Sequence, residues 1–502
     1  MNWKIIWKSL SNSQMKKRIL VVVGMLIVFR LLTYVPIPLN NAATLKQLIN
    51  TLFSSTKTPQ LLSYLNVLSG GALSNFSIML VGLGPYINAS IILQLLTKAI
   101  PKLEALNKEG ESGRKKINQY TRLLTFPLAI IQSVGAIYLV NQSAEQIGMN
   151  SIIAGAHLST WIIMVAALTG GSMLLMWMGE IITEQGIGNG ISLLITVGIV
   201  SRLPQSISSI VHAINGNTAK VIILGHKTFI NRQAAFYYAL ITFIAIVITM
   251  IIVKLNEASE KVTINYAKRV QGNRAYGGVT TTLPVKLIAA GVIPIIFAVA
   301  FLSVPSFVGQ LLTTAHGTHL QHLGTFLNKY FQSPTHATFA AGGLAPFVYP
   351  AVYFILVFAF TFFYTGITFN AKDIAENLQK QGGFIEGVRA GQTTEKFLSK
   401  KVNRLTVFGG MSLGLLALLP IILQKFINAS ISLSGTSLLI LVSVSLETLR
   451  AIESRALMLT YDQYEQPDFF YDQSEPVMAA TGASRLRLGP RFKNRFSRKK
   501  SE

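Results

Sequence analysis

Two short stretches decide the fold of this chain: GLGPYI at residues 82–87 and GVIPII at residues 291–296. Both read G-x-x-P-x-I, and each lies in a long apolar run. Glycine and proline are common in membrane helices, so either stretch alone indicates little. Two of them at matching positions in the two halves of a chain predict an internal repeat, in which one span of each half is broken near the middle of the membrane.

The composition around these stretches is that of an integral membrane protein. Of the 502 residues, 51% are hydrophobic and only 13% are charged, and the mean hydropathy is +0.48. The apolar runs reach the length of about 20 residues that crosses a bilayer as a helix, and they are far too long for barrel strands. The chain has no cysteine, which excludes disulfides, thiol catalysis and thiolate metal sites.

The apolar runs predict ten membrane spans. They lie near residues 19–37, 76–97, 121–140, 159–182, 187–211, 235–255, 286–311, 345–369, 404–424 and 435–458. Arg30 interrupts the first run and no small-residue cleavage site follows, so we interpret this run as a span and not as a signal peptide. Before it, residues 1–17 place apolar and basic side chains on opposite sides of a helix, which predicts an amphipathic helix on the membrane surface.

Basic residues between the spans predict the orientation. Lysine and arginine are dense at residues 1–18, 98–122, 254–286 and 372–404 and in the C-terminal tail. They are almost absent from residues 141–158 and 308–344, and only the loop at 202–234 departs from the alternation. Because basic loops stay in the cytoplasm, we expect both termini to be cytoplasmic. The net charge of +24 serves this orientation first and contact with acidic partners second.

Ten spans divide into five and five, which predicts an all-α polytopic membrane protein of two inverted halves. Since five is odd, equivalent helices of the halves cross the membrane in opposite directions. We expect an N-terminal half at 18–212, a C-terminal half at 213–460 and a disordered cytoplasmic tail at 461–502. The tail is acidic in its first part and strongly basic in its last.

The broken spans offer aliphatic residues and no charges at the midplane. The candidates are Leu83, Ile87 and Ile296. Branched aliphatic side chains around a pore exclude water and ions by dewetting, whereas an ion-coupled transporter buries charged groups at that depth. A pore with an apolar waist is therefore favoured. A secondary transporter and a scaffold or insertase without a pore are the alternatives, and any one of these residues could simply pack in the core or face lipid.

Nothing in the sequence indicates an enzyme or a cofactor. Walker A, G-x-S-x-G and H-E-x-x-H patterns do not occur. His316, His319 and His322 have the spacing of a possible metal site, but no carboxylate cluster accompanies them. We therefore predict no catalytic residue and no metal site.

The long cytoplasmic loops at 256–285 and 370–403 are candidate docking sites. Residues 262–266 alternate apolar and polar side chains, which predicts a strand, and Gly272 and Asn273 predict a turn after it. A basic hairpin held away from the membrane suits a partner protein or RNA. A solvated loop that only obeys the charge rule is the alternative.

Motifs along most of the chain resemble those of the SecY family, the large subunits of Sec protein-conducting channels. In order they are SGGALS before GLGPYINASIILQLL, then KEGESGRKKINQYTR, LMWMGEIITEQGIGNGISLLI, NYAKRVQGNR, AGVIPIIFA and GTSLLILVSV. The resemblance implies a bacterial cell-membrane channel that passes unfolded polypeptides and opens sideways into lipid. The pore is passive, and a motor ATPase or the ribosome drives the transport.

The resemblance also implies roles for particular residues. The constriction ring maps to Leu83, Ile87, Ile195, Ile296 and Ile440. The lateral gate maps to Pro85, Pro294 and Gln94, of which Gln94 would meet signal sequences.

A plug is implied at about residues 62–75, where a half-helix closes the channel from outside. Its named residues are Leu68, Ser69, Gly70, Gly71, Ala72, Leu73 and Ser74. A glycine lowers helix stability by roughly 1 kcal/mol relative to alanine, so this segment is suited to leave its position and return.

The implied partners are SecE-like and SecG-like small membrane subunits, a SecA-like motor ATPase, the ribosome, signal peptides and unfolded polypeptide substrates. The resemblance implies that the motor ATPase or the ribosome docks at Lys268, Arg269, Arg274 and Arg389. Arginine suits this role, since it binds phosphate and carboxylate with two parallel hydrogen bonds. Ala390 stands where the family usually has proline, and the tail is longer than usual. Anionic lipid or ribosomal RNA is the expected contact of that basic tail.

Overall fold

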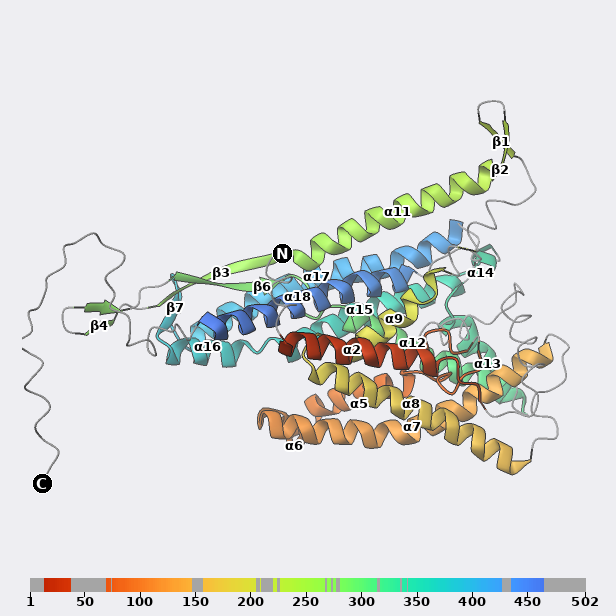
Figure 1. Cartoon of the computed structure of the whole chain (residues 1–502), viewed down its shortest axis with the longest axis horizontal. Coiled ribbons are helices and arrows are strands. Elements are labelled where there is room, and N and C mark those ends of the chain that lie inside the picture. The colour runs from red at the N-terminus through yellow and green to blue at the C-terminus, as the bar shows by residue number, and fades with distance from the viewer. Residues whose placement is uncertain are drawn as a thin grey trace, which may run out of the picture.

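The computed structural model describes residues 13–37, 69–73, 75–146, 157–204, 208, 220–223, 226–266, 269–271, 274–276, 280–313, 317–334, 336–340, 342–426 and 435–464. The long helices run roughly along one axis, and strands lie at both ends of the bundle (Figure 1). The predicted surface helix at 1–17 and the tail at 461–502 fall mostly outside the described residues.

Each of the ten predicted spans contains a helix. In chain order these are α2 (Ser13–Leu32), α5 (Gly84–Ala99), α7 (Glu111–Gln146), α8 (Leu158–Glu184), α9 (Gly190–Val200), α11 (Arg232–Glu257), α12 (Ile293–Thr313), α15 (Ala345–Thr368), α17 (Gln392–Phe426) and α18 (Gly435–Tyr464). Five of them, α7, α8, α12, α15 and α17, are long and apolar enough to cross a membrane on their described residues alone. The chain is a polytopic helical membrane protein, as predicted.

The same order of helix contacts occurs twice. In the first half α5 packs on α7, α7 on α8 and α8 on α9, and in the second half α12 packs on α15, α15 on α17 and α17 on α18. Helix α2 contacts α8 and α9 in the way that α11 contacts α17 and α18. The halves meet along two seams, α12 against α5 and α7, and α18 against α9. The predicted repeat of five and five helices therefore organises the fold.

Both G-x-x-P stretches start a helix in the same way. Gly82 and Gly291 have φ angles of 64° and 61°, a region that glycine adopts at no steric cost. Pro85 and Pro294 then stand in the first turn of α5 and α12, where a missing N–H breaks no helical bond. Helix α5 runs toward the end of the bundle that carries α6, whereas α12 runs away from that end toward α13 (Figure 1). The two helices are therefore inverted copies.

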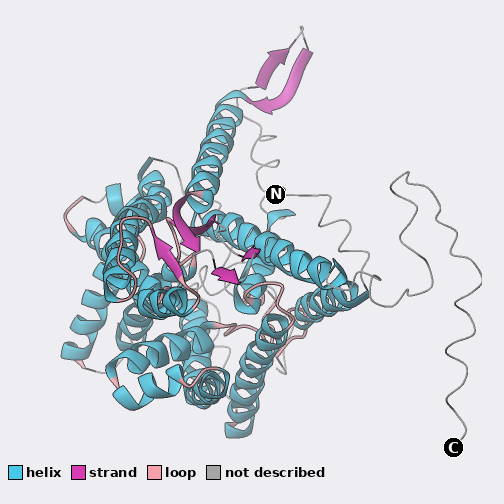
Figure 2. Cartoon of the chain, turned by 90° about the vertical axis from the view of Figure 1, so that its left-hand side faces the viewer, coloured by secondary structure: helices cyan, strands magenta, loops and turns pink. Residues whose placement is uncertain are grey.

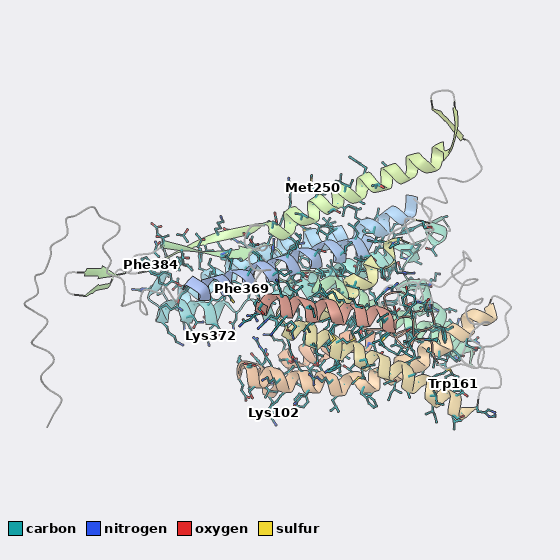
Figure 3. All side chains as sticks on the ribbon, in the orientation of Figure 1. Lys102, Trp161, Met250, Phe369, Lys372 and Phe384 are labelled. Atoms are coloured by element: carbon teal, nitrogen blue, oxygen red, sulfur yellow. The ribbon has the colours of Figure 1, made fainter. Side chains whose placement is uncertain are left out.

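Shorter helices connect the spans. They are α6 (Pro101–Lys108), α13 (Thr318–Phe331), α14 (His336–Ala340) and α16 (Ala371–Lys380). Helix α13 lies closely on α12, because a Cβ at Gly309 would come within 2.8 Å of Leu327 and one at Gly324 within 2.6 Å of Thr313. Side chains of α6 and α16, such as Lys102 and Lys372, lie toward one end of the bundle, and Trp161 of α8 lies near the other (Figure 3).

Within the described residues, seven short strands lie outside the bundle. They are β1 (Lys220–Ile223), β2 (His226–Asn231), β3 (Ser259–Tyr266), β4 (Arg269–Gln271), β5 (Arg274–Tyr276), β6 (Thr280–Lys286) and β7 (Gly383–Ile385). β1 pairs with β2 in a hairpin at the start of α11, and β4 pairs with β5 in a second hairpin. The predicted strand at 262–266 is confirmed as part of β3, and the predicted turn at Gly272 and Asn273 lies outside the described residues.

The two long loops at 256–285 and 370–403, which we predict to be cytoplasmic, fold together into one unit, named the cytoplasmic unit below. β3 pairs with β6 of its own loop and with β7 of the next loop, through Ile264 opposite Ile385. These two isoleucines belong to an apolar cluster that includes Leu378 of α16 and Leu398 of α17. Lys401 of α17 forms an ion pair with Glu260 of β3. The strands lie over the end of the helix bundle (Figure 2).

Candidate pore, plug and gate

The five predicted ring residues come together from both halves. Leu83 and Ile87 are on the first turn of α5, Ile195 is on α9, Ile296 is on α12 and Ile440 is on α18. None of these side chains is more than 9% exposed, and all five belong to one buried apolar cluster. Four helices from both halves thus contribute the predicted ring residues to one buried apolar cluster.

The described part of the plug segment lies against this cluster. Ser69 and Ala72 are fully buried, and Ala72 belongs to the same apolar cluster as the ring residues. Leu73 packs into a neighbouring cluster with Leu80 and Leu168. Residues 69–73 form turns, not a helix. Leu68, Ser74 and the stretch at 62–68, where the half-helix was expected, lie outside the described residues.

Gly70 occupies a place that admits no side chain. A Cβ at this position would lie 2.9 Å from the ring of Phe29 and 3.1 Å from the Cα atom of Gly198. Its carbonyl oxygen accepts a hydrogen bond from Nη1 of Arg30 at 2.9 Å. The sequence analysis explained this glycine by its effect on helix stability. It did not predict that Phe29 of α2 and Gly198 of α9 leave no space for a larger residue at this position. The signal that could have found it is Arg30, a charge inside an otherwise apolar run.

The predicted gate residues lie on or beside the seam between α5 and α12. Pro85 and Pro294 are buried in the first turns of these helices. Phe307 of α12 packs on Gly135 of α7, where a Cβ would come within 1.9 Å of the ring. Helix α12 therefore packs on both α5 and α7 along this seam.

Gln94 of α5 has one satisfied and one unsatisfied amide atom. Its Nε2 donates to Ser90 Oγ at 3.0 Å. Its Oε1 is buried and has no hydrogen-bond partner among the described residues. A buried acceptor without a partner costs free energy, so this amide is prepared to bind a donor that the described residues do not supply.

Among the predicted docking residues, Arg389 is the one whose side chain the structure describes. Arg389 is exposed on the turn that follows β7, and its carbonyl oxygen accepts from Thr394 Oγ1 at 2.9 Å. Arg269 and Arg274 are on β4 and β5, and nothing is described of their side chains. Lys268 lies outside the described residues. Strand β7, which joins the two loops, was not predicted, because three residues carry no readable alternation.

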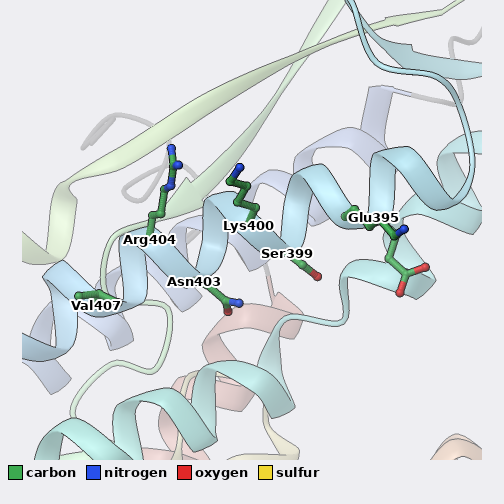
Figure 4. Close-up of a pocket in the computed structure, with 7 residues that line it drawn as sticks. Glu395, Ser399, Lys400, Asn403, Arg404 and Val407 are labelled. Carbon is green, nitrogen blue, oxygen red and sulfur yellow. The ribbon is translucent and has the colours of Figure 1, made fainter.

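A shallow cavity of about 430 Å³ lies along the first half of α17, apart from the predicted ring, gate and docking residues (Figure 4). It is lined from Glu395 to Val407 and includes Lys396, Lys400 and Arg404 on one side of the helix. It contains none of the predicted site residues. Among the described residues no three metal-binding side chains gather, and His316 lies outside them.

The first turn of α2 and the last part of α18 both contact the loop between α8 and α9. Arg18 of α2 donates to the Gln185 carbonyl oxygen at 3.0 Å, and the guanidinium of Arg455 on α18 lies against Gly186. The first turn of α2 and the last part of α18 therefore lie at the same end of the molecule, beside the loop between α8 and α9.

Together these features define a class of protein: a polytopic helical membrane protein of two inverted halves, which share one buried apolar cluster. A comparison with family models matches residues 77–449 to SecY. The chain belongs to the SecY family. It is a channel subunit of a protein translocase and not an enzyme.

Named relatives and solved structures agree with this assignment. The chain is 35% identical to the protein translocase subunit SecY of Streptomyces scabiei, over 91% of this chain and 98% of the relative. It is 36% identical to that of Mycobacterium bovis, with the same coverage. The fold is similar to a solved SecY structure whose plug domain is described as stabilising the closed state of the translocation channel, with a TM-score of 0.52 and 18% identity over 86% of this chain and 91% of that one.

Proposed function

We propose that this chain forms the passage for unfolded secretory polypeptides and releases apolar segments sideways into lipid. The single observation that carries the proposal is the meeting of Leu83, Ile87, Ile195, Ile296 and Ile440 in one buried apolar cluster. Branched side chains from four separate helices can part around a moving chain, and they exclude water when they close. The boundaries at 18–212 and 213–460 separate the two halves that part.

The segment at 62–75 acts as the plug, and the seam between α5 and α12 acts as the lateral gate. The full burial of Ala72 in the apolar cluster that also includes the ring residues supports a plug that seals the idle channel. Gln94 supports the gate role, since its unpartnered Oε1 can accept a hydrogen bond from the backbone of a signal peptide. Pro85 and Pro294 start the two gate helices and let the preceding turns bend.

Partners dock at the end of the molecule that carries the cytoplasmic unit. Arg389, with Lys268, Arg269 and Arg274, contacts a SecA-like motor ATPase or ribosomal RNA. SecE-like and SecG-like subunits cover part of the lipid-facing surface, and the basic tail binds anionic lipid. Both termini are cytoplasmic, and the membrane is a bacterial cell membrane. This agrees with the first turn of α2 and the last part of α18 lying at the same end of the molecule, where Arg18 and Arg455 both contact the loop between α8 and α9.

The rival functions make different demands. A secondary transporter would need a solute site with charged groups at the midplane, where the chain has aliphatic side chains instead. A scaffold or insertase without a pore would conduct nothing even when the plug is removed.

A disulfide crosslinking experiment tests the passage directly. A single cysteine replaces Ile296 in this cysteine-free chain, and a matched cysteine replaces Val304, which is 46% exposed on the same helix. A secretory polypeptide with its own cysteine is stalled in transit. We expect a crosslink at position 296 and none at position 304. Crosslinks at neither position in an assembled, stalled complex would mean that the polypeptide passes elsewhere.

A further inference from the structure

We propose that Arg30 is a positioning residue that latches the plug segment in the closed channel. The proposal rests on the proposed function of residues 69–73 as plug. Arg30 stands in the last turn of α2, and its guanidinium reaches out of that helix to the carbonyl oxygen of Gly70 at 2.9 Å. No motif assigns it this task.

The guanidinium is held in a fixed direction by its own helix end. Nη2 donates to Tyr34 Oη at 3.0 Å, and Nη1 lies 3.4 Å from Thr33 Oγ1. The Tyr34 ring, 58% exposed, has its centroid 5.0 Å from the cation. The guanidinium is therefore half-buried and lies beside an exposed aromatic ring. The planar fork leaves one donor aimed at the plug segment.

The Gly70 carbonyl depends on this donor. The described donors near it are Arg30 and Ser201, whose Oγ is 3.4 Å away. The Ser201 hydroxyl can donate only one hydrogen bond. It donates this bond to the Gly198 carbonyl oxygen, which lies only 2.8 Å from Oγ. A hydrogen bond from a charged donor is also stronger than one from a hydroxyl. Arg30 thus supplies most of the stabilisation at Gly70.

A separate set of hydrogen bonds fastens the segment that follows residues 69–73. Backbone bonds join Ile37 to Phe76 and Ile78 to Val35, at 2.9 and 3.1 Å. Ser77 Oγ donates to the carbonyl oxygen of Leu32 at 2.8 Å. These bonds fasten residues 76–78 to the end of α2, so they can persist while residues 69–73 swing out. The contact between Arg30 and Gly70 is a charged hydrogen bond that must break when residues 69–73 leave this position.

Thiol accessibility tests the latch. In the cysteine-free chain, Ala72→Cys places a thiol at a fully buried position of the plug, and Ala417→Cys places one at a fully buried position of α17. The channel is reconstituted with its co-purifying small subunits, and a charged, membrane-impermeant thiol reagent is applied. With Arg30→Gln we expect modification at position 72 to rise by roughly tenfold to a hundredfold, the range of a lost charge-assisted hydrogen bond, and position 417 to stay protected.

Control variants separate a latch from general loosening. Arg18→Gln removes the other described arginine of α2 that contacts a backbone carbonyl, and it should leave position 72 protected. Ser201→Ala should change little, because its hydroxyl bonds mainly to Gly198. Arg30→Lys keeps the charge and loses the fork, so it should give an intermediate rise. If Arg30→Gln does not assemble, Arg30→Lys provides the test of the latch. Unchanged thiol modification at position 72 in this variant would overturn the latch. Equal rises in modification at positions 72 and 417 would also overturn it, because they would indicate general loosening.

Ion flux through the same vesicles distinguishes the latch from the plug itself. Deletion of residues 65–72 should raise flux whether or not Arg30 is a latch. A raised flux on deletion with no change in Arg30→Gln would refute the latch and leave the proposed function standing. An unchanged flux on deletion would refute the plug, and the latch with it.

Discussion

Replacing Gly70 with alanine should open the channel without removing any hydrogen bond. The new Cβ would lie 2.9 Å from the Phe29 ring and 3.1 Å from the Gly198 Cα atom, closer than such atoms normally approach. Overpacking of this kind costs about 1–3 kcal/mol. The φ angle of +68° adds about 1–2 kcal/mol for a residue with a side chain. The closed state should therefore lose about 2–5 kcal/mol relative to the open state, since the released segment is free of both penalties.

The neighbouring glycine provides a matched control. Gly71 also has a positive φ, +89°, but no atom lies within 4 Å of the place its Cβ would take. Gly71→Ala should therefore cost only the backbone part, about 1–2 kcal/mol. Because 1.4 kcal/mol corresponds to tenfold in an equilibrium constant, the open fraction in Gly70→Ala should exceed that in Gly71→Ala by about 5- to 150-fold.

Chloride efflux from vesicles that contain the reconstituted channel measures this ratio. Equal efflux from the two variants would refute the argument, because it would mean that Phe29 and Gly198 do not confine Gly70 in the closed channel. Efflux at the wild-type level from both would show that the positive φ angles are not a feature of the sealed state at all.

Three further predictions concern the waist, the docking tip and the cytoplasmic unit. Ile440→Asn places an amide in the apolar cluster and should destabilise the closed state by about 1–3 kcal/mol. The variant should therefore export substrates with defective signal sequences, which an export assay measures. Rejection of these substrates as strict as in the wild type would contradict the ring assignment. Arg389→Glu should lower partner-driven export about tenfold, whereas Lys380→Glu on the exposed side of α16 should not, and equal effects would remove Arg389 from the docking site. Ile385→Ala should destabilise the three-stranded sheet by about 2–4 kcal/mol and speed proteolysis of the 370–403 loop, while Phe384→Ala, 42% exposed on the same strand, should not; equal rates would mean that β7 does not hold the loop.

The sequence alone was sufficient for the parts of this protein that have a local cause. Apolar runs of membrane length predict the spans, because a lipid environment forces each of them into a helix. The two G-x-x-P stretches predict where the repeat lies, because glycine permits a positive φ and proline favours a helix start wherever they occur. The aliphatic candidates Leu83, Ile87 and Ile296 followed from their place in those stretches, and Ile195 and Ile440 only from the family resemblance.

Contacts between distant segments were decided by the tertiary structure. Strand β7 exists because Ile385 pairs with Ile264, more than a hundred residues away, and three residues have no pattern of their own. Gly70 looked like a helix-weakening residue, and its close seat depends on Phe29 and Gly198 from two other helices. Arg30 looked like an interruption of an apolar run, and only the folded chain places it beside Gly70. Short-range sequence patterns determine whether a segment is apolar and which secondary structure it forms. The contacts of Gly70 with Phe29, Gly198 and Arg30 join distant segments, so no single segment predicts them.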